Sequence, residues 1–426
     1  MATDASPTTT AIGKASAKRI RSRLETLATF TEPGPGVSRL CYTPLERQAH
    51  DQFAHWMKEA GCSVETDPAG NTIATRPGTE DSLGALGTGS HLDSVYNGGA
   101  FDGIAGVVAG VEIAQLLQEA NISTRHPLKF VAFAGEEGAR FGQACIGSKL
   151  AAGMTTLDDL HTLTDRDGIT LAQAMESVGL VPAHAAATPW NADQWSAFVE
   201  LHIEQGNVLH DTNNQIGLVD LISGSTRLQL TMTGRPSHTG GTPMRGRSDA
   251  LVAASESVLF AEHLALDSAH RGTRATVGKL SVNPNSITTI PGQVSFSLDV
   301  RDIDADRQRE AAVTIVQRTL AACKRRAVGL DVELLADTSP VILPMLIREH
   351  LAEAAKSVGA DYRVLTSGAS HDSQMINTII PTGLLFVPSK NGLSHVPEEW
   401  TEASEIATGI DVLAATFFNL DSSLNA

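Results

Sequence analysis

The sequence of 426 residues predicts an α/β protein in which a mainly parallel, mixed sheet has helices on both faces, interrupted by an inserted α+β domain. Two observations predict the sheet. Short apolar runs alternate with helix-like stretches, and the run LKFVAFA at residues 128–134 is apolar at every position except Lys129, as in a strand buried on both faces. A third observation predicts the insertion, because from residue 221 onward apolar and polar side chains alternate, as in strands covered on one face.

The elements of the first part follow from periodicity and end signals. A helix at residues 43–60 places Phe53, Trp56 and Met57 at helical spacing, and Gly61 ends it. The remaining apolar segments are each bounded by a glycine-rich turn or a polar cluster. They predict helices at residues 14–30 and 103–119, and strands at residues 85–88, 128–134, 197–203 and 382–387.

The insertion opens with a strand that contains Leu228, Leu230 and Met232. Its other expected elements are a helix at residues 248–266, strands at 275–282 and 294–302, a helix at 304–326 and a strand at 331–335. This βαββαβ order is typical of a ferredoxin-like domain, in which two helices back one antiparallel sheet. We therefore expect a metal-binding catalytic domain at residues 1–220 and 339–426, and an inserted domain at residues 221–338.

Composition and charge exclude several classes of function. The chain has 48 acidic and 32 basic residues, a net charge of −16, and lacks the basic patch that a nucleic-acid-binding protein needs. The longest stretch of small and apolar residues, 103–118, is shorter than the roughly 20 residues of a membrane span. Residues 1–19 lack the apolar segment of a secretory signal and predict a disordered lead-in. Four scattered cysteines favour unpaired thiols in a reducing cytoplasm.

Residue types that bind metals are concentrated in five segments, most of which directly follow an expected strand. Each motif alone also fits an ordinary surface pair or a solvated helix start, but loops at the carboxyl ends of parallel strands converge on one crevice. Nitrogen and oxygen ligands without a thiolate suit Zn²⁺, Mn²⁺, Co²⁺ or Ni²⁺. The segments are GSHLDSVYNGGAFDG at 89–103, AGEEGARFG at 134–142, ELHIEQG at 200–206, SGASHDSQ at 367–374 and GLSHVPEE at 392–399.

In this order the five segments resemble the amidase/hydantoinase/carbamoylase family of dinuclear metal hydrolases, which is related to the dizinc aminopeptidases. The resemblance runs from about residue 20 to the end of the chain. It implies a dizinc aminopeptidase-like fold, hydrolysis of linear amide or ureido C–N bonds, and a homodimer formed through an inserted dimerisation and lid domain. The family also includes allantoate amidohydrolases, ureidoglycolate hydrolases and β-ureidopropionases.

The resemblance implies two divalent metal ions and assigns the protein ligands of each ion. Asp102 would bridge the ions, His91 and His202 would complete one coordination sphere, and Glu137 and His395 would complete the other. Asp93 would accept the second ring N–H of His91 and so orient the imidazole. The family also often has a cis peptide bond after the bridging aspartate, which here is the bond from residue 102 to residue 103.

The resemblance also implies catalytic and substrate-binding residues. Glu136 would act as general base and then as general acid, and His238 would donate to the substrate oxyanion across a dimer interface. Arg301 would bind the α-carboxylate of the substrate, and strand alternation independently directs it away from the helices of its domain. Gln205 would position the ureido group, and His371 would lie near the substrate pocket.

One position departs from the family pattern. Thr288 occupies the position at which the family usually has an asparagine, and a hydroxyl cannot make the two-point contact of an amide; Asn285 matches a second common asparagine. The expected reaction is conversion of an N-carbamoyl-L-amino acid to the L-amino acid, CO₂ and ammonia. Alternatives are an allantoate or ureidoglycolate amidohydrolase or an N-acyl amino acid amidase. A binding protein that has lost catalysis, or a true aminopeptidase, fits the motifs less well.

Overall fold

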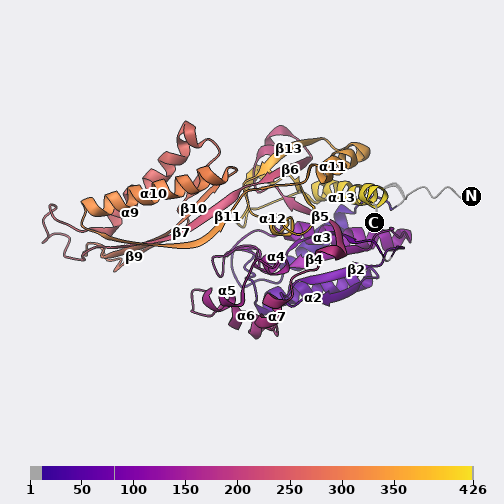
Figure 1. Ribbon diagram of the computed structural model, residues 1–426, viewed down its shortest axis with the longest axis horizontal. Helices are drawn as coiled ribbons and strands as arrows, with labels where there is room; N and C mark the ends of the chain where they lie inside the picture. The colour runs from indigo at the N-terminus through magenta and orange to yellow at the C-terminus, as the bar shows by residue number, and fades with distance from the viewer. Residues whose placement is uncertain (1–11, 81, 425–426) are drawn as a thin grey trace, which may run out of the picture. The chain divides into compact units, whose positions relative to one another are not determined.

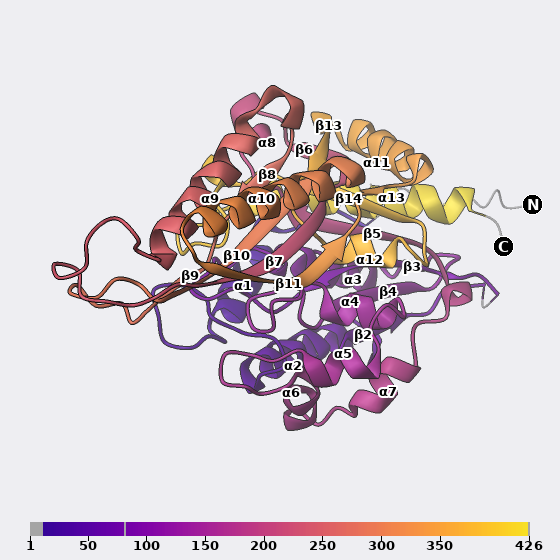
Figure 2. The ribbon, with the colours of Figure 1, turned by 60° about the vertical axis from the view of Figure 1, so that its left-hand side comes forward.

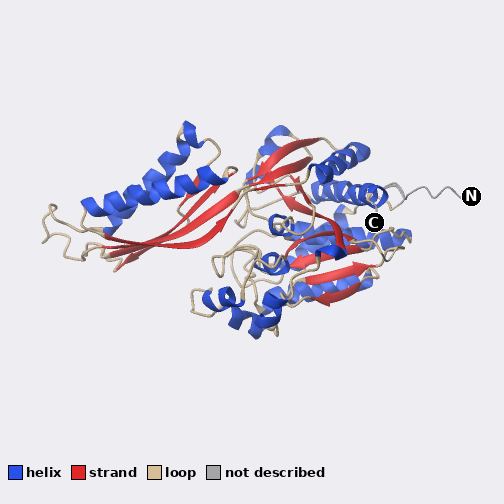
Figure 3. Ribbon diagram, viewed as in Figure 1, coloured by secondary structure: helices blue, strands red, loops and turns tan. Residues whose placement is uncertain are grey.

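The computed structural model describes residues 12–80 and 82–424, which form two compact units. The first unit takes in the chain up to Asp220 and again from Ile342, and the second is Leu221–Val341. Most of the expected lead-in lies outside the described residues, whereas Ile12 is buried in the core of the first unit. Figures 1 and 3 show the elements of each unit.

The first unit is built on a nine-stranded mixed sheet whose order is β1-β2-β4-β3-β5-β14-β6-β12, with β13 paired to β6. The centre is parallel, since β3 pairs in parallel with both β4 and β5, and β14 pairs in parallel with β5. The predicted fold class is confirmed. The strands are β1 Ser63–Thr66, β2 Thr72–Arg76, β3 Ala85–His91, β4 Leu128–Phe133, β5 Trp195–Ile203, β6 Ile216–Ile222, β12 Val341–Ile342, β13 Tyr362–Ser367 and β14 Thr382–Val387.

Helices cover both faces of this sheet, and β4 shows why. Its residues alternate between two separate apolar clusters: Phe130 and Ala132 join one, whereas Val131 and Phe133 join the other. One cluster includes side chains of α1 Ala17–Ala28, α2 Pro44–Glu59, α3 Ile104–Ala120, α11 Met345–Val358 and α13 Ala403–Ser423. The opposite cluster includes side chains of α4 Ile146–Ala151 and α12 Asp372–Ile376. The smaller helices are α5 Leu157–Thr162, α6 Leu171–Ser177, α7 Pro182–Ala187 and α8 Val208–Thr212.

A buried ionic cluster fixes helix α1 to helix α3. Glu112 lies in the middle of α3 and is fully buried. Its Oε1 lies 2.6 Å from Nη2 of Arg19, and its Oε2 lies 2.6 Å from Nη1 of Arg23. The backbone N–H of Ser16, the N-cap of α1, also donates to Oε1 at 2.9 Å. The carboxylate inside this otherwise apolar stretch of α3 therefore accepts hydrogen bonds from three residues, Ser16, Arg19 and Arg23.

Substituting Glu112 by leucine is expected to destabilise the protein by about 2–3 kcal/mol. Removing one partner of a buried pair costs about 3–5 kcal/mol, and the partial exposure of Arg19 lowers this figure because its guanidinium can turn to water. Glu119, which pairs with Arg19 at the surface, provides the control, with an expected loss below about 1 kcal/mol for Glu119→Gln. Urea unfolding of both variants measures the difference, and equal midpoints would contradict the assignment.

The second unit has the expected ferredoxin-like layout. Its antiparallel sheet has the order β11-β7-β10, with β8 and β9 both paired to the far side of β10. Figure 2 shows the two helices on one face of this sheet. The elements are β7 Gly224–Thr233, α9 Ala250–Leu266, β8 Arg274–Thr276, β9 Leu280–Asn283, β10 Gln293–Asp302, α10 Ala305–Arg325 and β11 Gly329–Thr338. Short 3₁₀ turns elsewhere in the chain span Ala192–Gln194, Ser268–His270 and Lys390–Gly392.

The single strand expected at residues 275–282 is instead two short strands. Thr276 pairs with Asp299 and Leu280 pairs with Phe296, so four steps along one strand oppose three steps along β10. One extra residue interrupts the ladder, as in a β-bulge. A bulge leaves the apolar-polar pattern largely intact, and the sequence alone therefore did not reveal it.

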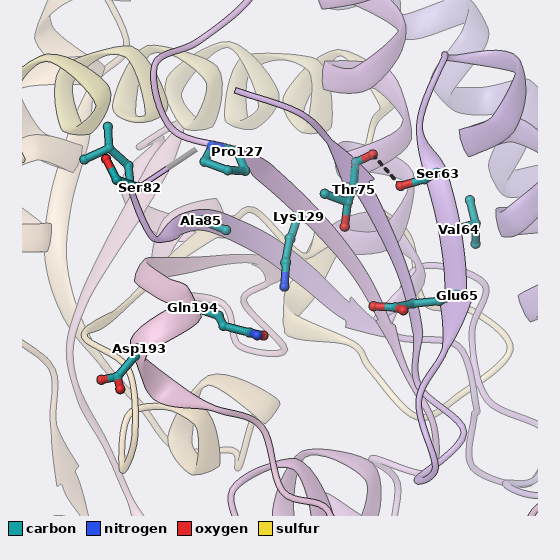
Figure 4. A pocket seen from close by; sticks show the side chains of 11 residues that line it. Ser63, Val64, Glu65, Thr75, Ser82, Ala85, Pro127, Lys129, Asp193 and Gln194 are labelled. Carbon is teal, nitrogen blue, oxygen red and sulfur yellow. Dashed lines mark hydrogen bonds between the residues drawn. The ribbon is translucent and has the colours of Figure 1, made fainter. Parts of the chain in front are cut away.

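A surface hollow of about 610 Å³ lies at the amino end of the first unit's central strands. It is lined by residues that include Ala85, at the start of β3, and Lys129, near the start of β4. Figure 4 shows Lys129 between Gln194 and Glu65. Because His91 ends β3, this hollow is at the opposite end of the strands from the expected metal ligands. Among the described helices, none is long and apolar enough to cross a membrane.

Candidate metal centre

The carboxyl ends of three neighbouring parallel strands bring together four of the expected site residues. His91 is the last residue of β3, and His202 is the penultimate residue of β5. Glu136 and Glu137 follow shortly after the end of β4. Because β3 is hydrogen-bonded in parallel to both β4 and β5, these ends meet at one edge of the sheet.

Asp102 enters this edge from the loop between β3 and α3, and the following glycine makes the approach possible. Gly103 has a φ of 70°, in the region that side chains avoid. A Cβ atom at Gly103 would lie 2.4 Å from two atoms of the His91 ring. The backbone can therefore pass against the imidazole only at a residue without a side chain, which places Asp102 beside His91.

Asp102 is the centre of the site. Its Oδ1 lies 3.0 Å from Nε2 of His202 and 3.7 Å from Nε2 of His91. Its Oδ2 lies 3.2 Å from Nε2 of His395, an atom that is 3.3 Å from Oε1 of Glu137. One carboxylate thus belongs to two groups of candidate metal ligands, and within each group the ligand atoms lie within 4.8 Å of one another. The groups are His91, Asp102 and His202, and Asp102, Glu137 and His395.

The donor atoms of these two groups fit divalent metal ions. Oδ1 of Asp102 is buried and accepts no hydrogen bond from the described residues, although its carboxylate lies at the centre of both groups. Burial raises the pKa of Asp102, but the imidazoles of His202, His395 and His91 outweigh burial and hold this pKa well below its usual range. An ionised carboxylate among three imidazole nitrogens is a ligand set that suits zinc and similar metals.

Gln205, three residues after His202, also contacts the central carboxylate. Its Nε2 donates to Oδ2 of Asp102 at 2.6 Å and lies 3.5 Å from Nε2 of His395. Its Oε1 is buried and accepts no hydrogen bond from the described residues. Gln205 is therefore anchored by its amide N–H group and keeps its carbonyl oxygen as an acceptor for a further donor.

A third group of potential ligands contains Glu200, His202 and His371. Both oxygens of Glu200 already accept hydrogen bonds, from Oγ of Ser90 at 2.8 Å and from the N–H of Ser373 at 2.9 Å. The ring of His371 packs edge-on against that of His202, with centroids 4.5 Å apart. We therefore interpret this group as support for His202. A role of His371 in substrate binding stays a prediction.

Asp93 has more contacts than the sequence indicates, and one further detail differs from the prediction. Nδ1 of His91 lies 3.1 Å from the backbone oxygen of Asp93 and 3.5 Å from its carboxylate. That carboxylate also accepts the backbone N–H groups of Glu136 and Glu137, at 2.8 Å and 3.0 Å, because the turn after β4 leaves these donors unpaired. The peptide bond after Asp102 is trans, since the positive φ of the next residue already provides the turn.

Glu136 lies beside both groups of candidate ligands, with its Oε2 3.8 Å from Nε2 of His91. Burial is the largest effect that raises its pKa to about 7; the charges of Glu137 and Asp93 add to it, and His91 opposes it. The thiol of Cys145 donates to Oε1 at 3.1 Å. The sequence predicts Cys145 only as one of four unpaired thiols, and its distance in sequence from Glu136 follows no motif that could have revealed the contact.

Glu399 is a second residue that sequence reasoning missed. Its Oε1 accepts the backbone N–H groups of Phe101 and Asp102, at 2.9 Å and 3.0 Å. Its Oε2 accepts from Oγ of Ser394 at 2.8 Å and from the N–H of His395 at 3.4 Å. Burial, with the negative charge of Asp102, raises the pKa of Glu399 to about 7. It belongs to one of the five segments, but nothing in the sequence distinguishes it from the adjacent Glu398.

In the second unit, His238 and Thr288 lie in neighbouring loops. A bridge joins His238 to Thr289, and the N–H of Thr239 donates to the backbone oxygen of Thr288 at 3.1 Å. Nδ1 of His238 accepts the N–H groups of two glycines, Gly240 and Gly241, each at 3.0 Å. Nδ1 therefore serves as an acceptor, which leaves Nε2 as the ring nitrogen that can donate. Asn285 is exposed in the same loop as Thr288, with a φ of 52°.

Arg301 lies near the carboxyl end of strand β10, whereas the loop of Thr288 precedes its amino end. Its Nε donates to Oδ2 of Asp299 at 3.0 Å, and Nε of Arg227 lies 3.6 Å from the same oxygen. Burial raises the pKa of Asp299, but the two guanidinium groups outweigh it and hold this pKa below its ordinary value. Asp299 thus orients Arg301 on the sheet face that carries alternate polar residues of β10.

Comparison with known proteins places this arrangement in a family. Residues 87–419 match the peptidase family M20/M25/M40. The chain is 40% identical over 408 residues to the N-carbamoyl-L-amino-acid amidohydrolase of Paenarthrobacter aurescens, covering 96% of this chain and 99% of that protein. It is 34% identical over 405 residues to the allantoate amidohydrolase of Escherichia coli, covering 94% and 97%.

A solved structure supports the same relationship. The amidase of the hydantoinase/carbamoylase family from Burkholderia vietnamiensis matches with a TM-score of 0.89 at 33% identity, covering 95% of this chain and 97% of that one. The family resemblance and the enzyme class predicted from the sequence are thus confirmed. The chain belongs to the peptidase family M20/M25/M40 and, within it, to the hydantoinase/carbamoylase amidases.

Proposed function

We propose that this protein hydrolyses N-carbamoyl-L-amino acids with two divalent metal ions. The observation that carries the proposal is the pair of ligand groups that share Asp102, with Glu136 beside them. Several relatives at 32–40% identity bear the name N-carbamoyl-L-amino-acid amidohydrolase, which favours this substrate class. One water and one substrate yield the amino acid, CO₂ and ammonia.

We assign one ion to His91, Asp102 and His202, and the other to Asp102, Glu137 and His395. The ligand set suits Zn²⁺, Mn²⁺, Co²⁺ or Ni²⁺. When bound, a pair of such ions polarises a substrate carbonyl and makes a water molecule acidic at neutral pH. In this proposal each ion has protein ligands from three separate segments of the chain, so its binding depends on the folded sheet edge.

Glu136 is the residue that we assign to proton transfer. Its Oε1 is engaged by Cys145, and its Oε2 faces His91, so Oε2 is the atom that accepts a proton from the attacking water. The same atom then delivers this proton to the leaving nitrogen. Gln205 contributes its unpaired Oε1, which we assign as the acceptor for a ureido N–H group.

The second unit supplies the other substrate contacts in this proposal. Nε2–H of His238 donates to the oxygen of the reacting carbonyl, and Arg301 binds the α-carboxylate. Thr288 and Asn285 lie in one loop beside that of His238 and are assigned to the rest of the substrate. Thr288 has a single hydroxyl where the family usually has an asparagine. We expect this difference to alter which substrate side chains the enzyme prefers.

The geometry of the second unit supports a homodimer through this unit. The loop of His238 follows β7, whose residue Thr233 pairs with Gln293 at the start of β10, whereas Arg301 is eight residues further along β10. At about 3.4 Å per residue, Gln293 and Arg301 are roughly 27 Å apart along the strand. This distance is too long for one small substrate to contact both the loop of His238 and Arg301 of the same chain. We therefore propose that each active site takes His238 from one chain and Arg301 from the other.

Subunit complementation tests this arrangement. His238→Ala and Arg301→Ala are each expected to lose nearly all activity alone. Co-expressed in equal amounts, they should regain about a quarter of the wild-type activity, because half of the dimers are mixed and each mixed dimer has one intact site. Activity that stays at the level of the single variants would exclude sharing between subunits.

The function itself is tested by assaying product release from three substrates side by side. N-carbamoyl-L-methionine should release methionine and ammonia, and this activity should disappear with a chelator and return with added Mn²⁺, Zn²⁺, Co²⁺ or Ni²⁺. Faster turnover of allantoate, or release of acetate from N-acetyl-L-methionine, would favour one of the two alternatives. The D-enantiomer of the carbamoyl substrate is the control for specific binding.

A further inference from the structure

Glu399 joins two loops that carry candidate metal ligands but that are far apart in sequence. One of its carboxylate oxygens accepts the N–H groups of Phe101 and Asp102, and the other accepts from Ser394 and His395. The carboxylate is thus fixed by four donors, of which three are backbone groups. Because all four donors belong to two loops, these hydrogen bonds fix the position of the carboxylate and the conformation of both loops.

The loop of Asp102 is shaped to admit this side chain. A Cβ atom at Gly99 would lie 2.1 Å from Oε1 of Glu399 and 2.4 Å from its Cβ. No residue larger than glycine fits there while Glu399 keeps its position. The contact therefore depends on both loops, because Glu399 supplies the carboxylate and Gly99 leaves the space that it occupies.

The two candidate metal groups depend on Glu399 to different degrees. His91 and His202 belong to strands β3 and β5, and the sheet holds them. His395 lies in a loop, has a φ of 61°, and has a side chain that is 48% exposed. Its backbone N–H donates to Glu399, which is thus a direct link from His395 to the buried part of the site.

We propose that Glu399 is a positioning residue for the ion held by Asp102, Glu137 and His395; this inference rests on the two-ion function proposed above. Without Glu399, His395 loses an anchor and the Asp102 loop loses two hydrogen bonds. The ion on the His395 side therefore binds more weakly, whereas the ion between His91 and His202 keeps two ligands that the sheet positions.

Metal binding measured by calorimetry and by metal analysis tests the inference without reference to activity. Titration of the chelator-treated wild-type enzyme with Mn²⁺ should give two binding events. Glu399→Ala should weaken the second event by about 10–100-fold and leave close to one ion after gel filtration. Glu398→Ala is the matched control, since Glu398 is the adjacent, exposed carboxylate, and it should retain both ions.

Two further variants keep the inference falsifiable if Glu399→Ala does not fold. Glu399→Gln preserves one acceptor oxygen for the Phe101 and Asp102 N–H groups but places an amide NH₂ group near the N–H of His395. It should therefore weaken binding of the same ion. Gly99→Ala should act similarly by displacing Glu399. A second ion of unchanged affinity in all folded variants would overturn the inference. A wild-type enzyme that binds only one ion would overturn the two-ion function, and the role of Glu399 would then be judged on that ion.

Discussion

Substitution of Glu136 by glutamine is expected to lower kcat by about 10²–10⁴-fold, the range typical for loss of a general acid–base group. Glutamine keeps the shape of the side chain, so its Oε1 can still accept from the thiol of Cys145. What it loses is the ability of the Oε2 position to take up a proton next to His91. The metal ligands are untouched, and KM should change much less than kcat.

Steady-state kinetics with N-carbamoyl-L-methionine, together with metal analysis of the purified variant, check this result. The exposed Glu176, on helix α6, serves as the control position for Glu→Gln, with unchanged kinetics. If Glu136→Gln retains its metal and keeps kcat within tenfold of wild type, Glu136 is not the proton-transfer group.

Substitution of Asp102 by asparagine is expected to prevent binding of both proposed ions and to bring activity to background. The two carboxylate oxygens of Asp102 face different imidazoles, with Oδ1 toward His202 and Oδ2 toward His395. An amide offers one oxygen and one nitrogen that carries two hydrogens, so one of the two groups loses a ligand and both lose a negative charge. Affinity should fall by more than the roughly 100-fold seen when an outer hydrogen-bond partner is removed.

Metal titration of the Asp102→Asn variant is the decisive measurement, because low activity alone has many causes. The exposed Asp158 provides the control for loss of one negative charge, and Asp158→Asn should bind both ions normally. Comparison with Glu399→Ala is informative, since that variant is expected to lose one ion and Asp102→Asn to lose two. Retention of two ions by the asparagine variant would rule out a shared ligand.

The sequence predicted those features that depend on periodicity and on strand ends. The apolar β4, in which Lys129 is the one charged residue, and the alternating β10 follow directly from burial on two faces and on one face. His91 and His202 were predicted together because parallel strands bring their carboxyl ends to one edge. The assignment of ligands to particular ions came from family resemblance, since spacing alone does not pair residues from different loops.

Contacts between loops were the part that the sequence could not reveal. Glu399 and Asp102 meet across nearly the full length of the chain, and Cys145 reaches Glu136 through an irregular turn. Neither contact has a period or a motif spacing. The bulge between β8 and β9 escaped detection for a related reason, because one extra residue changes hydrogen bonding without much change in the hydrophobic pattern.

The close approach of Gly103 to the His91 ring affects how results from variant libraries of this enzyme should be interpreted. In a saturation screen scored by turnover, Gly103 is expected to tolerate no replacement, because any side chain at this φ would collide with the imidazole. Such intolerance resembles that of a reacting group, although glycine has no group that could react. Screens that aim to broaden substrate range therefore gain nothing by diversifying this position, and are better directed to the loop that carries Thr288 and Asn285, which we propose to contact the substrate.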